Sequence, residues 1–167
     1  QYRVLKKNGV CLVLSSRRGI NIPAPCISEE TEFERDVWKR TEEYFRQAYA
    51  KYGVCEYPQN EAELPLCMGK YGFRNVTTEY IVANLTPDNP CYSVETAHAM
   101  INANRQNDLD SADNMLRIAP QIVKPSEVDE LKRLVNERYD KRLQLYDCGI
   151  KQWDTNVNVT MVVRGEK

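Results

Sequence analysis

The sequence has only one histidine, His98, in 167 residues, and no two cysteines show the two-residue spacing of a zinc knuckle or a redox motif. The seven glycines are dispersed, so a glycine-rich loop that could cradle phosphate is missing as well. We therefore expect no metal site and no cofactor.

Long apolar runs and an excess of one charge are also missing. The longest apolar run, residues 10–14, is far shorter than the ~20 residues that a helix needs to cross a bilayer. Lysine and arginine total 23 against 24 aspartate and glutamate residues, which gives a net charge of −1 and no basic footprint for nucleic acid. We expect neither a membrane-spanning segment nor a nucleic-acid partner.

The composition that remains is that of a globular protein, with 42% hydrophobic and 28% charged residues. A chain of this length can bury one continuous core. No internal repeat, low-complexity segment or linker interrupts it. We predict a single globular domain over residues 1–167.

The cysteines are even in number and scattered along the chain, which favours structural disulfides in an oxidising compartment. They are Cys11, Cys26, Cys55, Cys67, Cys91 and Cys148. Sequence spacing cannot choose their pairing, except that Pro58 and Pro65 indicate a stiff loop that a Cys55–Cys67 bridge would close. The alternative is a cytosolic protein with six buried thiols.

Three Asn-x-Thr triplets, at Asn75, Asn84 and Asn158, predict N-glycosylation and agree with an extracellular location. The chain opens at Gln1 without a charged start and apolar segment, so we expect a signal peptide to have been removed. Together with the cysteines, these features predict a secreted protein or one on the extracellular face of a membrane.

Hydrophobic periodicity and capping residues predict eight elements in an α+β order. Ser28 and Ser93 are expected helix caps, and Gly53 and Gly149 are expected helix stops. The elements are a strand at 10–15 with a hairpin partner at 20–22, a helix at 28–52, a strand at 75–85, short helices at 93–104 and 112–118, a helix at 125–147 and a strand at 153–164.

This order predicts an α+β fold, disulfide-stabilised, in which two long and two short helices pack against a small, mostly antiparallel sheet.

Candidate catalytic residues are few. His98 could act as a general base oriented by Glu95, one turn before it on the helix. The alternative is a boundary histidine that bonds a neighbour and water. On the helix at 125–147, Arg138 and Arg142 could clamp an anion with their guanidinium groups, or their stems could simply cover the edge of the apolar stripe.

Aromatic residues give the strongest hint of a binding surface. The apolar arc of the helix at 28–52 is wider than one packing surface requires, so this helix must bury a second flank. Either a neighbouring helix covers that flank, or Trp38, Phe45, Tyr49 and Tyr52 form an exposed groove that contacts a ligand or partner.

From these patterns we predict a secreted, disulfide-bonded, N-glycosylated and non-enzymatic recognition domain. Its aromatic helix flank would bind an extracellular protein or a small apolar ligand. One alternative is a secreted hydrolase that uses His98 or a pair of carboxylates. Another is a protease inhibitor that presents the Cys55–Cys67 loop, already ordered before binding.

Overall fold

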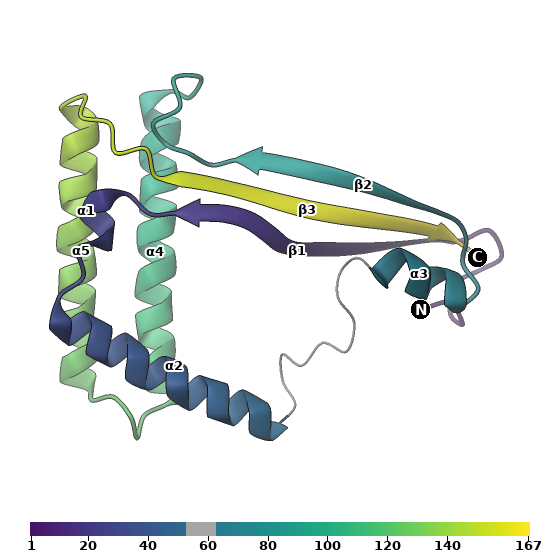
Figure 1. Ribbon diagram of the computed structural model, residues 1–167, viewed down its shortest axis with the longest axis horizontal. Helices are drawn as coiled ribbons and strands as arrows, with labels where there is room; N and C mark the ends of the chain where they lie inside the picture. The colour runs from purple at the N-terminus through teal and green to yellow at the C-terminus, as the bar shows by residue number, and fades with distance from the viewer. Residues whose placement is uncertain (53–62) are drawn as a thin grey trace. The chain divides into compact units, whose positions relative to one another are not determined.

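The computed structural model describes residues 1–52 and 63–167, which group into two compact units (Figure 1). Unit 1 comprises the described residues 1–20, 63–84 and 156–167. Unit 2 comprises residues 21–52 and 85–155. Each is described by itself below, and the single domain expected over residues 1–167 stays a prediction.

Unit 1 is built on a three-stranded sheet with the strand order β1-β3-β2. The strands are β1 (Val10–Ile22), β2 (Arg74–Asn84) and β3 (Thr155–Glu166). β2 pairs antiparallel with β3, with Tyr80 opposite Met161. β1 is also antiparallel to β3. Just before β1, Asn8 N donates to the Lys167 carbonyl at 3.2 Å and Lys167 N donates to the Gly9 carbonyl at 3.0 Å, whereas Gly19 near the other end of β1 lies beside Val157. β1 and β2 therefore point the same way (Figure 1).

The hairpin predicted around residues 16–19 is wrong, because β1 continues through this segment as one strand. Gly19 explains the continuation. A Cβ atom there would lie 2.4 Å from the carbonyl oxygen of Val157, so the glycine permits a close approach to β3 instead of making a turn.

The core of unit 1 lies on one face of the sheet. Helix α3 (Leu64–Lys70) supplies Met68, which packs with Phe73 from the start of the β2 segment. The sheet contributes Cys11, Met161 and Val163 to the same cluster. These strand residues alternate along β1 and β3, so the period-two pattern of the sequence directs them to a single face.

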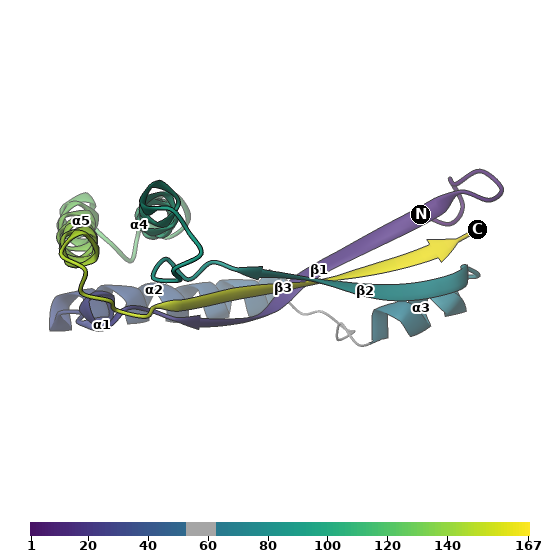
Figure 2. The ribbon, with the colours of Figure 1, turned by 90° about the horizontal axis from the view of Figure 1, so that it is seen from above.

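Unit 2 is helical. It contains α1 (Pro25–Ser28), α2 (Glu32–Tyr52), α4 (Val94–Ile118) and α5 (Pro125–Asp147). Helices α4 and α5 lie side by side (Figures 1 and 2). One core cluster joins α2, α4 and α5, and a second joins α1 to α4 and α5.

Two helix boundaries differ from prediction. Helix α2 begins at Glu32, since Thr31 and Glu34 form a reciprocal cap in which Thr31 N donates to Glu34 Oε2 at 2.7 Å and Glu34 N to Thr31 Oγ1 at 3.2 Å. The two short helices expected around Ser111 are one helix, α4. The Ser111 hydroxyl donates to the Asn107 carbonyl one turn back at 2.8 Å, so it does not start a new helix.

The fold class is confirmed as α+β with a small antiparallel sheet, whereas the predicted disulfide stabilisation is not supported. Among the described residues, Cys11, Cys26, Cys91 and Cys148 are all thiols. The predicted Cys55–Cys67 pair involves Cys55, which lies outside the described residues. Three clusters of buried apolar residues form the core.

In the described residues, no helix is both long and apolar enough to cross a membrane, which agrees with the sequence.

Candidate functional site

The outer edge of β1 is a strongly apolar exposed feature of unit 1. β1 ends the strand order and, within residues 1–52 and 63–167, has β3 as its one strand neighbour. Val10, Leu12 and Leu14 are 44%, 55% and 63% exposed although they belong to an uninterrupted apolar run. Such runs are typical of strands inside a parallel sheet with both faces covered. β1 thus combines the sequence of an interior strand with the position of an edge strand.

The opposite edge of the sheet has a different character. β2 exposes Tyr80, Ile81 and Val82, but the polar residues Thr77, Thr78 and Glu79 come directly before them. Polar and charged residues along a strand are a common way to protect a sheet edge from further pairing. The exposed edges of the sheet are therefore not equivalent.

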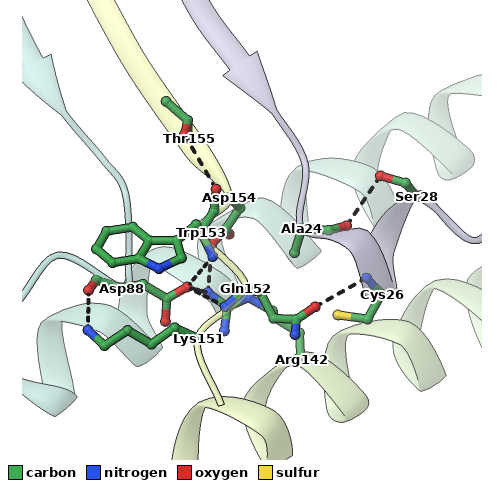
Figure 3. Close-up of polar contacts among 10 residues, drawn as sticks. All are labelled: Ala24, Cys26, Ser28, Asp88, Arg142, Lys151, Gln152, Trp153, Asp154 and Thr155. Atoms are coloured by element: carbon green, nitrogen blue, oxygen red, sulfur yellow. Dashed lines mark hydrogen bonds and ion pairs between the residues drawn. The ribbon is translucent and has the colours of Figure 1, made fainter. Parts of the chain in front are cut away.

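Unit 2 contains a second site, where a buried arginine binds two carboxylates (Figure 3). Arg142 of α5 is 0% exposed. Its Nη2 donates to Asp88 Oδ2 at 2.8 Å and to Asp154 Oδ1 at 2.6 Å. Buried charges persist in proteins when they are paired and hydrogen-bonded, as they are here.

Asp88 is the organising residue of this cluster. It is 2% exposed, and its Oδ2 also accepts the backbone N–H of Gln152 at 3.0 Å and of Trp153 at 2.8 Å. Gln152 in turn accepts the backbone N–H of Cys26 at 3.4 Å. The segment that follows α5 therefore joins two others: it bonds Asp88, after β2, through its backbone and Cys26, after β1, through the side chain of Gln152 (Figure 3).

The cluster is not fully satisfied. Within the described part of the chain, Asp88 Oδ1 and the Nε and Nη1 atoms of Arg142 are buried and have no hydrogen-bond partner. Each such group costs about 1–3 kcal/mol of desolvation.

Trp153 and Lys151 stand at the surface of the cluster. Trp153 has a φ of 51° and an indole that is 55% exposed. The Lys151 ammonium lies 5.1 Å from the centre of the indole ring and donates to the Asp88 carbonyl oxygen at 2.7 Å. Sequence analysis identified Arg142 but not Asp88, Lys151 or Trp153, because nothing local relates Asp88 to a segment more than 60 residues later.

His98 pairs with a different acid from the one expected. Its Nε2 lies 2.7 Å from Asp147 Oδ1, and its ring meets Tyr146 edge-on with centroids 5.5 Å apart. Glu95 is exposed in the first turn of α4. The Asp147 partner lies 49 residues away in sequence and could not be found from helical spacing.

The two arginines proposed as an anion clamp both bind carboxylates of the chain itself. Arg138 Nη1 pairs with Glu34, which is fully buried at the start of α2. Burial lowers the pKa of Arg138. Arg142 occupies the cluster described above. The clamp itself stays a prediction.

The aromatic flank of α2 lines a groove of about 610 Å³ together with Met115 and Ile118 of α4. Trp38, Phe45 and Tyr49 all contribute to it, and the last two stack with ring centroids 5.9 Å apart. The structure therefore brings these three predicted residues together. The side chain of Tyr52, the last residue of α2, lies outside what the structure describes.

The three predicted glycan acceptors all lie on strands. Asn75 follows the first residue of β2 and donates to Glu166 Oε2 at 2.8 Å. Asn84 ends β2, and Asn158 is exposed in β3. Glycosylation and extracellular location stay predictions.

Comparison with solved structures gives weak similarities, of which one is described here. The chain is similar to Haemonchus contortus phosphoethanolamine N-methyltransferase 2, solved in complex with phosphomonomethylethanolamine and S-adenosylhomocysteine, at 16% identity and a TM-score of 0.33. The match covers 99% of this chain and spans 28% of the methyltransferase chain. No family model and no curated protein matches. A likeness at this level does not establish a shared fold or activity.

The function predicted from sequence, a secreted and disulfide-bonded recognition domain, is wrong. It depended on covalent bracing, and four of the six cysteines are thiols. The hydrolase and inhibitor alternatives, which shared the same secreted framework, are set aside with it.

Proposed function

We propose that the β-sheet of this chain is part of a larger mixed sheet, in which a further strand from a partner pairs with β1 and runs parallel to it. The observation that carries the proposal is the uninterrupted apolar run of β1 at an exposed sheet edge. An edge strand presents a row of N–H and C=O groups that another strand can pair with.

The faces of β1 indicate what the partner must supply. Cys11 and Val13 point toward the core that α3 and Phe73 cover. Leu12 and Leu14 occupy the alternate positions and are exposed. In parallel α/β sheets, helices cover both faces. The expected partner therefore brings both a strand and a helix that packs on Leu12 and Leu14.

The burial involved is enough to support assembly. Covering the exposed parts of Val10, Leu12 and Leu14 contributes roughly 2–4 kcal/mol at the usual value per unit of apolar area. Backbone hydrogen bonds along the edge add to this. A second copy of this chain could also cover the edge, but a two-fold axis normal to the sheet would make the two β1 strands antiparallel. The direction of pairing therefore separates the proposal from a dimer.

Photo-crosslinking in the natural host tests this direction. A benzoylphenylalanine is placed singly at Val10, Leu12 or Leu14, and the crosslinked peptides are identified by mass spectrometry. For a parallel partner strand, crosslinks to residues of that strand should have partner numbers that increase in the same order as the three positions. Crosslinks to the helix that covers Leu12 and Leu14 are assigned separately, because such a helix runs opposite to the strands. The matched control is Ile81 on β2, which is similarly exposed but lies on the protected edge.

Three results would contradict the proposal. Crosslinks to a partner strand whose residue numbers decrease from Val10 to Leu14 would indicate an antiparallel strand. Crosslinks between two copies of β1 would indicate a dimer. Equal yields from Leu12 and Ile81 would indicate non-specific capture by exposed apolar residues.

A further inference from the structure

Trp153 has a backbone conformation that bulky residues avoid. Its φ of 51° lies in the left-handed region, where a side chain with a Cβ is strained. Gly149, four residues earlier, shows the same sign of φ at 74° but is a glycine and ends α5 without strain. A strained residue persists only where its surroundings fix it.

The surroundings that fix Trp153 are themselves unfavourable. The backbone N–H of Trp153 donates to Asp88, which is held by the fully buried Arg142. Buried ion pairs of this kind often cost more in desolvation than they return. Asp88 and Arg142 also keep polar atoms without partners in the described residues. The structure thus combines strain and buried charge to hold one residue in place.

The result is an indole exposed beside a cation. The Trp153 ring is 55% exposed, and the Lys151 ammonium lies 5.1 Å from its centre. The hydrogen bond of Lys151 goes to the neutral carbonyl of Asp88, and no ion pair of Lys151 occurs in the described residues. Two ammonium protons and one positive charge are therefore available over one face of the indole, and the other face is the one on which a ligand ring could stack.

We propose that Trp153 and Lys151 form a binding platform for a planar aromatic ligand that carries an anionic group. The ring of the ligand stacks on the exposed indole, as aromatic rings do on tryptophan. The anionic group binds Lys151 as a point charge. Asp88 and Arg142 are positioning residues, because they hold the Trp153 backbone and do not contact the ligand. This site is separate from the β1 edge and does not depend on its partner.

Titrations with three probes, followed by nuclear magnetic resonance, test the platform. Adenosine monophosphate has a planar ring and an anion, adenosine has the ring alone, and inorganic phosphate has the anion alone. The nucleotide should shift the Trp153 indole N–H and the amides of residues 151–155, with saturation in the millimolar range. Adenosine should bind more weakly, and phosphate should leave the indole unchanged.

Two variants and one control identify the residues responsible. Trp153→Asn removes the ring but tolerates a positive φ, so it should keep the fold while weakening nucleotide binding about tenfold or more. Lys151→Gln should weaken binding of the nucleotide and leave adenosine unchanged. Trp38→Phe changes the other tryptophan of the chain and should have no effect on either probe.

The proposal would be overturned if the nucleotide caused no shift up to about 10 mM, well above the affinity of one stacked and charged contact. Shifts that survive Trp153→Asn, or that gather around Trp38 instead, would also overturn it. A Trp153→Asn chain that unfolds would be replaced by Trp153→Tyr, which should retain most of the binding. Complete loss of nucleotide binding in Trp153→Tyr would count against stacking on residue 153.

Discussion

Replacing Asp88 with alanine is expected to destabilise unit 2 strongly. The carboxylate accepts three hydrogen bonds, one from Arg142 and two from the backbone of Gln152 and Trp153. After the substitution, Arg142 stays buried with Asp154 as its remaining acid partner, and two backbone N–H groups lose their acceptor.

The size of the effect follows from these contacts. Breaking a buried ion pair by removing one partner typically costs about 3–5 kcal/mol, because the other charge stays buried. The two N–H groups add to this unless water reaches them. We expect Asp88→Ala to lower the free energy of unfolding by about 4 kcal/mol, a large part of the ~5–15 kcal/mol of a whole protein. Asp88→Asn keeps an acceptor oxygen and should cost less.

Urea unfolding at neutral pH, followed by circular dichroism, measures the difference. The control is Asp113→Ala, which breaks an exposed pair with Lys132 of similar length, 2.9 Å, and should cost less than about 1 kcal/mol. A loss from Asp88→Ala no larger than that of the control would refute this reasoning.

Three further predictions concern cysteines, pH and the groove. Thiol titration of the denatured, unreduced chain should find at least four thiols. In the native chain, the exposed Cys91 and Cys148 should react quickly. Cys26 should react slowly, because burial raises the pKa of its thiol. Fewer than four titratable thiols would support the disulfides predicted from sequence. Burial also raises the pKa of Asp108, so its protonated form stabilises the fold at low pH and this contribution is lost as pH rises through the folded pKa. Urea unfolding at several pH values measures the free energy of unfolding of Asp108→Asn and of the parent. The value of the variant minus that of the parent should rise between pH 3 and pH 7. A difference that stays constant over this range would contradict the prediction. Trp38→Ala should lower the free energy of unfolding by roughly 2 kcal/mol, because Trp38 packs against the cluster around Val37 and Met115. Thermal unfolding measures the change. An unchanged stability would mean that the indole does not support the core.

Elements with strong local signals were predicted well from sequence. Helix α5 has its predicted bounds, with Pro125 in the first turn and Gly149 in the left-handed conformation after its end. β2 and β3 follow from β-branched composition and alternation. These signals involve neighbouring residues only, so they can be recognised in the sequence without knowledge of the fold.

Features set by distant residues were not predicted. The continuity of α4 depends on the burial of Ala112 and Met115 against α2 and α5, which outweighs the capping tendency of Ser111. The pair of Asp88 and Arg142 joins residues 54 apart. The disulfide prediction relied on an even count of cysteines, whereas the Cys11 thiol donates to Gln1 Oε1 at 2.9 Å inside an apolar cluster.

Within the candidate sites, composition located the aromatic residues of α2 but not the groove wall that α4 supplies. The apolar run of β1 was recognised as a buried strand, and the structure shows that its outer edge is exposed. That contrast is informative because the sequence and the position of the strand disagree.

Hydrogen exchange at single amides of β1 is the most direct measurement of the proposed sheet completion. In the isolated chain, amides that face β3 should be protected and the alternate amides should exchange rapidly, because successive N–H groups of a strand point to opposite sides. In protein isolated from its natural source, both sets should be protected. Rapid exchange of the alternate amides in that material would mean that no strand pairs with β1, and would contradict the account.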